Sequence, residues 1–441
     1  MWVPWPHDGL GVPCEQRHPE EDPIRHRFPI AVASAVALLL TFLGPASAGT
    51  LTSIDQFGTD AYDEAWGVAI DASGVTYVAG TTAGALPGQV AAGGNDAFLR
   101  ATAPDGTVLW MRQFGTAHDD RAFFVAIDGL GGIYVTGVTA GRLPGQTKNG
   151  GFDSFVRKYD TNGNELWTRQ FGTSADDIAS EVAADANGVI VIGNTGGAFG
   201  GTNRGHDDVF LRAFDPNGGE RWTKQFGTPA TDIGFGLALA GDGSFFAIGF
   251  TRGALPGQRN RGGNDGWVRR YGSDGTIVWT REFGTSSEDL AFGMAIQDDI
   301  LYLSGTTFGS FGGQGGGSGD PFVRALDAAD GATLWTRQGG SPAEDWSTNL
   351  ALDANGPYVV GYTFGDLAGS NEGRSDVFVW ALDAQGTDRF TTQFGTPKTD
   401  YGNWSTIEGG SLVVVGFAGG AFEGETNVGG GDAYVVSLQT T

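Results

Sequence analysis

Short runs of alternating apolar and polar residues, separated by glycine-rich turns, follow one another along most of the chain. One stretch shows four such runs, at residues 122–128, 132–137, 153–160 and 164–171. Each contains β-branched or aromatic residues and ends near a turn signal such as Asp-Gly, Asn-Gly or Ser-Gly. No long run has the period of a helix. The pattern therefore predicts short β-strands in groups of four.

The groups repeat. The phrase Gln-Phe-Gly-Thr, or a close relative, recurs at intervals of 55 to 57 residues, beginning at Gln56, Gln113, Gln170, Gln225, Glu282, Gln338 and Gln393. A nearly constant period of this size indicates a propeller or a solenoid. We assign blades, from inner to outer strand, to residues 65–114, 122–171, 178–226, 234–283, 291–338 and 347–394.

The two ends of the chain complement each other. Residues 403–438 supply only three strands, whereas residues 51–57 form a single strand that resembles an outer one. We therefore predict an all-β fold, a seven-bladed β-propeller with four antiparallel strands per blade, whose N-terminal strand completes the C-terminal blade and hides open sheet edges. A solenoid would need capping units and would leave this complementarity unexplained.

Aromatic residues occupy fixed positions of the repeat. We interpret them as blade-to-blade packing rather than as a lectin-type site, because nearly every unit has them. They stand on the outer strand at Trp110, Trp167, Trp222, Trp279, Trp335 and Phe390, and on the third strand at Phe98, Phe155, Phe210, Trp267, Phe322, Phe378 and Tyr434.

The first 48 residues are expected to be a signal peptide with a long polar lead. A basic Arg25-His26-Arg27 segment precedes the apolar residues 28–43, and Ala46-Ser47-Ala48 offers a cleavage site. The apolar run is too short for a good spanning helix. We expect residues 49–441 to form the propeller, without a membrane span, in a protein that is secreted, periplasmic or on the cell surface. The single cysteine, Cys14, lies in the lead, so no disulfide is expected in the mature chain.

Charge narrows the range of partners. The 441 residues include 51 acidic and 26 basic side chains, and the formal net charge is −25. Nucleic acid is therefore not an expected partner, since phosphate binding needs a basic face. A protein or glycan ligand is compatible with this composition, and we expect a monomer.

Two aspartate series recur in all seven units. The third-strand aspartates open the third strand, at Asp96, Asp153, Asp208, Asp265, Asp320, Asp376 and Asp432. The turn aspartates follow the Gly-Thr turn, at Asp63, Asp120, Asp177, Asp232, Asp289, Asp345 and Asp400. The simpler interpretation is that these carboxylates accept backbone N–H bonds in their turns. The alternative is an acidic face that binds Ca²⁺, which prefers several oxygen ligands, and the turn aspartates are its candidate ligands.

Basic residues also repeat. They stand on the third strand at Arg100, Arg157, Arg212, Arg269 and Arg324, and on the outer strand at Arg112, Arg169, Lys224, Arg281 and Arg337. Both series end together before the sixth blade, which suggests a shared structural role such as pairing with the aspartates. A cationic binding stripe is the alternative.

The repeat unit Trp-x-Arg-Gln-Phe-Gly-Thr…Asp…Gly-Gly-x-Asp-x-Phe-[Leu/Val]-Arg, clearest in residues 57–171, resembles the seven-bladed β-propeller (SBBP) repeat family. The resemblance covers essentially the whole expected mature chain. It implies an exported or surface bacterial protein, without implying an activity. The chain departs from the pattern in residues 403–408 and at Gly339, which replaces the motif phenylalanine.

A ligand site is expected where the units differ, because a scaffold needs similar repeats and a single ligand does not. The candidate binding residues are Trp66, Phe124, Glu181, Asn349 and Trp404 on inner strands, and Arg204 and Arg259 in the variable loops between second and third strands. Drift in tolerant loops is the simpler explanation of these differences. We expect a non-enzymatic binding scaffold. The alternative is a carbohydrate-active hydrolase or lyase with carboxylates at the channel mouth.

Overall fold

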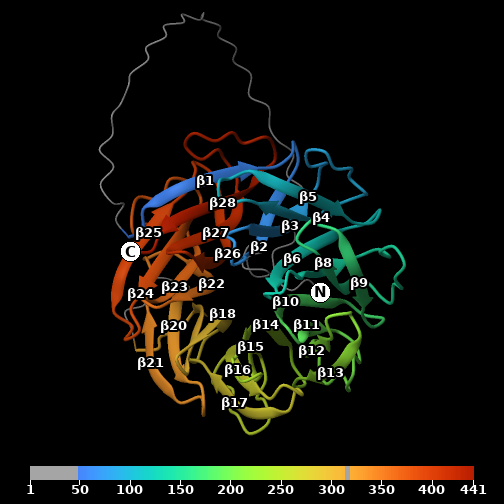
Figure 1. Ribbon diagram of the computed structural model, residues 1–441. Coiled ribbons are helices and arrows are strands. Elements are labelled where there is room, and N and C mark those ends of the chain that lie inside the picture. The colour runs from blue at the N-terminus through green and yellow to red at the C-terminus, as the bar shows by residue number, and fades with distance from the viewer. Residues whose placement is uncertain (1–47, 313–317) are drawn as a thin grey trace, which may run out of the picture. The chain divides into compact units, whose positions relative to one another are not determined.

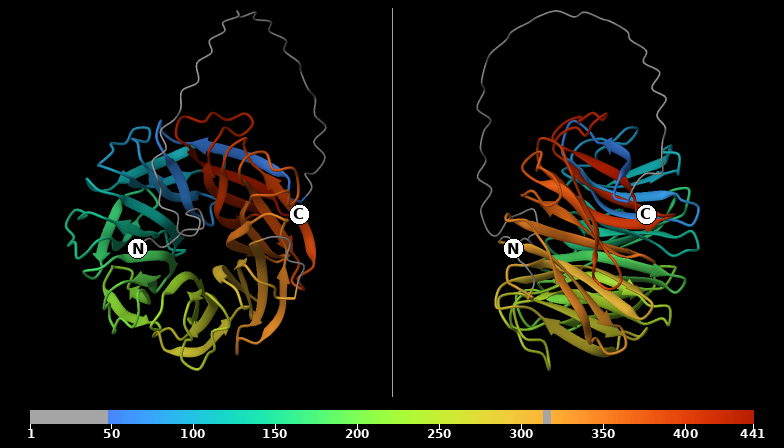
Figure 2. Two further views of the ribbon diagram at one scale, coloured as in Figure 1. Left: turned by 180° about the vertical axis from the view of Figure 1, so that it is seen from behind. Right: turned by 90° about the vertical axis from the view of Figure 1, so that its left-hand side faces the viewer.

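The computed structural model describes residues 48–312 and 318–441, and this part of the chain contains 28 strands and no helix. The strands form seven four-stranded antiparallel sheets arranged around one axis (Figures 1 and 2). The predicted seven-bladed propeller is therefore confirmed. The expected signal peptide, residues 1–48, lies outside the described residues except for Ala48.

Six blades are continuous in sequence, and each runs from its innermost to its outermost strand. They are β2 (Asp63–Ile70), β3 (Thr76–Thr82), β4 (Asp96–Thr102) and β5 (Val108–Phe114); β6 (Asp120–Ile127), β7 (Ile133–Thr139), β8 (Asp153–Tyr159) and β9 (Glu165–Phe171); β10 (Asp177–Asp185), β11 (Gly188–Thr195), β12 (Asp208–Phe214) and β13 (Glu220–Phe226); β14 (Asp232–Leu239), β15 (Phe245–Thr251), β16 (Asp265–Tyr271) and β17 (Ile277–Phe283); β18 (Asp289–Gln297), β19 (Ile300–Thr307), β20 (Asp320–Asp327) and β21 (Thr333–Gln338); β22 (Asp345–Asp353), β23 (Gly356–Thr363), β24 (Asp376–Leu382) and β25 (Asp388–Phe394).

The seventh blade joins the two ends of the chain. Its strands are β26 (Asp400–Glu408), β27 (Ser411–Ala418), β28 (Asp432–Gln439) and, outermost, β1 (Leu51–Phe57). The antiparallel β1–β28 pairing runs from Leu51 opposite Leu438 to Phe57 opposite Ala433. The predicted closure by the N-terminal strand is confirmed, and it covers an edge that would otherwise be free to pair with another chain.

Every innermost strand contains a register shift of one residue. In β2, for example, Ala65 lies opposite Gly80 and Gly67 lies opposite Ala79, so Trp66 is the extra residue. A bulge of this kind bends the strand and redirects its side chains. The seven bulges therefore aim the side chains of the innermost strands as these strands converge near the axis (Figure 1).

The core lies between neighbouring blades. Phe98 is fully buried and meets Phe57 of the preceding blade edge to face, with ring centroids 5.8 Å apart. The outer tryptophans reach the next blade, since the Trp110 indole donates a hydrogen bond of 2.9 Å to the carbonyl of Thr161. These contacts confirm that the repeated aromatic residues are blade-to-blade packing.

Candidate functional site

The turn aspartates are buried parts of the scaffold. In the second blade, the backbone N–H and the hydroxyl of Thr116 donate to Asp120 Oδ2 at 2.6 and 2.8 Å. The same pattern recurs at every other junction, with Ser341 in place of threonine at one of them. All seven carboxyl groups are fully buried. The turn interpretation of the sequence thus matches the contacts that the structure shows.

Each turn aspartate faces a third-strand aspartate across a glycine. A methyl group built on Gly172 would lie 2.6 Å from Asp153 Oδ1 and 2.8 Å from Asp177 Oδ2, so the two carboxyl groups flank the same Cα atom. We call these seven arrangements the carboxyl pairs. Glycine is required at this position, because any side chain would collide with both acids.

Burial raises the pKa of all seven turn aspartates, against the hydrogen bonds from threonine or serine, and in six of them the neighbouring aspartate raises it further. For Asp400 the pKa rises from 3.8 to about 7. Among residues 48–312 and 318–441, no group of three or more His, Cys, Asp or Glu side chains could hold a metal ion. Calcium binding by the turn aspartates stays a prediction.

The predicted inner-strand candidates come together near the axis. The rings of Phe124 in β6 and Trp404 in β26 meet edge to face, with centroids 4.5 Å apart. They belong to blades two positions apart, and Gly67 of the blade between them has no side chain to separate them. Trp66 meets Phe123 of the next blade with centroids 5.9 Å apart.

Polar candidates occupy other parts of the same ring of innermost strands. Glu181 Oε2 accepts a 3.1 Å hydrogen bond from the backbone N–H of Leu237, and burial raises the pKa of Glu181 well above its usual value. Asn349 Oδ1 accepts hydrogen bonds from the backbone N–H and hydroxyl of Ser405, at 3.1 and 2.7 Å. These contacts join adjacent blades, so both side chains have a structural role on the axis.

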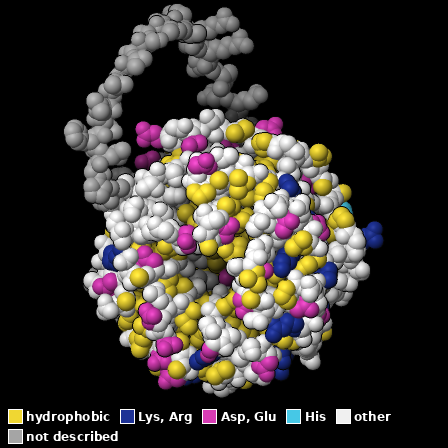
Figure 3. All heavy atoms as spheres, in the orientation of Figure 1, with side chains coloured by type: hydrophobic (Ala, Val, Ile, Leu, Met, Phe, Trp, Pro, Cys, Tyr) yellow, Lys and Arg dark blue, Asp and Glu magenta, His cyan; other side chains and the backbone are white. Residues whose placement is uncertain are grey.

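The two arginine candidates lie elsewhere. Arg204 and Arg259 are exposed in the loops that follow β11 and β15, away from the innermost strands. The structure thus brings five of the seven predicted binding residues to the innermost strands and leaves Arg204 and Arg259 on the loops. Figure 3 shows a face with a hollow at its centre and with most of its Lys and Arg over the part of the ring that contains β4–β13.

Sequence reasoning missed a line of touching aromatic rings that crosses four blades. We call it the aromatic arc; the line runs through Phe308, Trp346, Tyr362, Tyr401, Phe417 and Tyr62, and Phe364 packs on Tyr362 beside it. Neighbouring centroids are between 4.8 and 6.5 Å apart, within the range of aromatic pairing. Most rings are buried or half-buried, while Tyr62 and Phe364 are 41% and 42% exposed.

The arc lies at the end of the blades that carries the variable loops. Tyr62, Trp346 and Tyr401 stand at the starts of innermost strands, and Phe364 directly follows β23. In the sixth and seventh blades, the second residue of the innermost strand and the residue opposite it are both aromatic: Trp346 faces Tyr362, and Tyr401 faces Phe417. At the same position, four other blades have the pairs Arg121–Val138, Ile178–Asn194, Ile233–Phe250 and Leu290–Thr306. Alignment of the units on the turn aspartate would have shown this difference.

Comparison with known proteins agrees with this geometry. A model of the SBBP family, described as a beta-propeller repeat, matches residues 109–144, which run from β5 into the loop after β7. The chain therefore contains an SBBP beta-propeller repeat, as its sequence predicted.

Several known proteins resemble this propeller in sequence or in fold. The regulatory protein FlaEY of Caulobacter vibrioides is 26% identical over 82% of the chain, which spans 42% of that protein's length. Among solved structures, the WD40 propeller domain of Doa1 is 11% identical, covers 89% of the chain with 97% of its own, and has a TM-score of 0.51. BamB of Moraxella catarrhalis is 16% identical, with coverages of 89% and 100% and a TM-score of 0.45. The likeness to these structures concerns the fold.

The repeated arginines of the SBBP unit stack on rings. The third-strand arginine of one blade lies over the motif phenylalanine of the preceding blade, as for Arg157 over Phe114 at 4.0 Å and Arg269 over Phe226 at 3.8 Å. Outer-strand arginines donate to turn carbonyls of the next blade, as Arg112 Nε does to Gly163 at 2.8 Å. The shared structural role is therefore seen, with aromatic rings and carbonyls as partners in place of the expected aspartates.

Proposed function

We propose that this SBBP propeller is an exported, non-enzymatic interaction module that binds a protein partner on the aromatic arc. The observation that carries the proposal is the arc itself, because it breaks the repeat on four consecutive blades and leaves two large rings exposed. The blades of β6–β9 and β10–β13 have no aromatic residue at the positions of Trp346 and Tyr362, so the repeat does not require rings there. Aromatic residues held rigidly at a surface are the usual anchors of protein interfaces.

The contacts of the arc support a protein partner over a sugar. Trp346 and Tyr362 are buried, and the Trp346 indole donates a 2.6 Å hydrogen bond to Glu344, so neither ring offers a free face for a pyranose. Tyr62 ends the arc and Phe364 contacts Tyr362 near its middle, so the two exposed rings are separate anchors. Anchors separated by buried rings favour an extended protein surface. The relative from Caulobacter, described as regulatory, is compatible with such a role.

The hydrolase alternative has less support. Cleavage of a glycosidic bond needs two carboxyl groups that face one substrate. The turn aspartates and third-strand aspartates are buried and bonded to their own turns, and Glu181 shares the axis with aromatic and amide side chains.

The described residues contain no helix long and apolar enough to cross a membrane.

Photo-crosslinking in the producing organism tests the proposal. A benzophenone amino acid replaces Tyr62 or Phe364, and matched controls carry it at Leu109 or Leu166, which are 50% and 54% exposed on outer strands. We expect a discrete, protease-sensitive adduct from positions 62 and 364 that the control positions do not give. Equal adducts at all four positions, or adducts removed only by glycosidases, would contradict the proposal.

A further inference from the structure

Five of the seven junctions share a stacked arginine–phenylalanine pair; the junction of β25 and β28 keeps the ring, Phe394, beside Val436, and one junction lacks both residues. At the junction of β17 and β20, Arg324 lies 4.5 Å from the ring centre of Phe283. The corresponding residues between β21 and β24 are Gly339 and Trp380. Both members of the pair are thus replaced together, and a phenyl ring that six outer strands carry is missing from β21.

Gly339 is not required by its backbone conformation. It is absent from the glycines with positive φ, so a phenylalanine could adopt the same backbone there. A methyl group built on Gly339 would lie 3.3 Å from Cη2 and Cζ2 of Trp380, so the indole reaches toward the place from which the ring has been removed. Trp380 is itself 7% exposed and forms a fixed wall.

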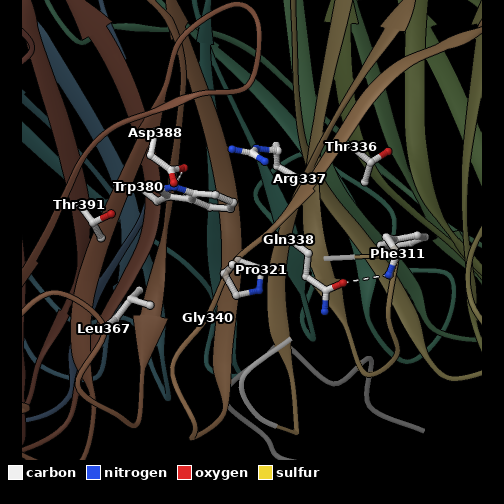
Figure 4. A pocket seen from close by; sticks show the side chains of 12 residues that line it. Phe311, Pro321, Thr336, Arg337, Gln338, Gly340, Leu367, Trp380, Asp388 and Thr391 are labelled. Atoms are coloured by element: carbon white, nitrogen blue, oxygen red, sulfur yellow. Dashed lines mark hydrogen bonds between the residues drawn. The ribbon is translucent and has the colours of Figure 1, made fainter. Parts of the chain in front are cut away.

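A pocket of about 500 Å³ opens beside this indole. Figure 4 shows Trp380 extending from β24, with Phe311, Pro321 and Leu367 at other sides of the pocket. This volume is within the range of small-ligand sites, about 300–1,000 Å³. Two of the walls, Trp380 and Leu367, take the positions that Arg324 and Phe311 hold beside Phe283 at the preceding junction.

Polar groups line the outer part of the pocket. The Trp380 indole donates a 2.9 Å hydrogen bond to Asp388 Oδ1, and Thr391 and Arg337 lie in the same lining (Figure 4). Arg337 and Asp388 are exposed. They offer a donor and an acceptor to the main chain on either side of an inserted side chain.

We propose that this pocket receives the ring of a phenylalanine or tyrosine side chain presented by a second polypeptide. At the regular junctions the equivalent place holds a benzyl group from the chain's own outer strand; here the Trp380 indole reaches into part of that place and leaves the pocket beside it open. The outer strand β21 supplies no such group, so a benzyl group in this pocket would come from another polypeptide. The exposed donor and acceptor favour a peptide as its carrier over a free aromatic compound. The site goes beyond the aromatic arc and uses none of its residues.

Saturation-transfer NMR with small probes tests the site. The probes are N-acetyl-phenylalaninamide, N-acetyl-leucinamide and p-cresol, each with the folded wild-type protein. The repaired variant carries Gly339→Phe and Trp380→Arg, which rebuild the pair seen at Phe283 and Arg324. We expect transfer to the phenylalanine probe in the wild type, and binding that is weaker by about tenfold or more in the repaired variant.

The remaining outcomes distinguish a polypeptide from a free aromatic compound as the source of the ring. They also cover the case in which the repaired variant does not fold. Equal transfer from the wild type and the folded repaired variant would overturn the site. Binding of p-cresol without binding of the phenylalanine probe would overturn the polypeptide as its source, and equal binding of the leucine probe would overturn the aromatic preference. If the repaired variant does not fold, Leu367→Trp fills the pocket from the opposite wall and is expected to abolish the same signal. Crosslinking at the arc is unaffected by these changes, so the two proposals fail separately.

Discussion

Replacement of Asp400 by asparagine should stabilise the propeller at alkaline pH. Asp400 Oδ2 accepts a 2.6 Å hydrogen bond from the backbone N–H of Thr396, and its carboxyl group shares Gly395 with that of Asp376. Asp376 Oδ1 is buried and has no hydrogen-bond donor among the described residues. An asparagine keeps an oxygen for Thr396, while it removes one of two buried negative charges.

The size of the effect follows from the pKa. Burial, with a smaller contribution from Asp376, raises the pKa of Asp400 from 3.8 to about 7. The folded state therefore holds a proton that the unfolded state has lost, and the free energy of unfolding decreases as pH rises through this window. Each pH unit corresponds to about 1.4 kcal/mol, so about 4 kcal/mol is lost between pH 4 and pH 8 through this one group. Asp400→Asn removes that loss.

Urea unfolding at pH 4.5, 6 and 8, with a chelator present, measures the effect. We expect similar midpoints of wild type and variant at pH 4.5 and a higher midpoint for the variant at pH 8. Asp128→Asn is the opposite control: although burial opposes its ionisation, backbone N–H groups of Gly132 and Leu130 and the Lys158 ammonium hold the pKa of Asp128 below its usual value. Its variant should lose stability at neutral pH and less in acid.

A lower midpoint of Asp400→Asn at pH 8, or an unchanged pH slope, would refute the reasoning on the carboxyl pairs. A parallel series with Ca²⁺ tests the metal hypothesis of the turn aspartates. A bound cation would favour the charged pair, so calcium would raise the wild-type midpoint and Asp400→Asn would remove that rise.

Three further changes test the scaffold. Deletion of residues 51–57 removes the closing strand and should abolish cooperative melting measured by calorimetry; a soluble truncate that melts in one sharp transition would contradict the closure. Arg269→Met keeps the aliphatic bulk beside Phe226 but removes the stacked guanidinium, and should cost about 1–2 kcal/mol in urea unfolding, so an unchanged midpoint would rule out this stacking as a source of stability. Glu181→Gln should leave stability unchanged near pH 4 and reduce its decline toward pH 9, because burial raises the pKa of Glu181 well above 4.5 and its charged form is disfavoured; thermal melts across this range would show a parallel decline if that were wrong.

The fold could be predicted because each unit repeats the same local sequence signals for strands and turns. The alternation within a run specifies a strand, the motif near Gln113 or Gln170 marks the end of a blade, and the unmatched strand at residues 51–57 has only one place to pair. These signals are local or periodic, so they can be read without knowledge of which blades touch. The ring closure follows from counting strands.

The site could be predicted only in part, because its contacts join blades. The inner-strand candidates were found because they differ between units, and Phe124 and Trp404 do meet, though the sequence gives no sign that Gly67 lets them do so. The aromatic arc was missed because its rings, such as Tyr62 and Phe417, are far apart along the chain. Burial of both aspartate series likewise could not be predicted from the sequence, since a turn aspartate has the same sequence pattern whether it is exposed or covered.

The aromatic arc and the pocket beside Trp380 fall on one side of the ring, and this bears on how a partner would be oriented. The arc runs from β19 to the start of β2, and the pocket beside Trp380 lies between β21 and β25 within the same half. The candidate loop cations Arg204 and Arg259 belong to blades of the other half. A surface with exact seven-fold symmetry would let a partner bind in seven equivalent orientations. With aromatic rings on one half and arginines on the other, only one orientation matches both. A partner that places aromatic side chains over β19–β28 and acidic groups over the loops after β11 and β15 would satisfy both halves at once. Charge reversal at Arg204 and Arg259 should then slow association and reduce its salt dependence while leaving the crosslinks at the arc in place.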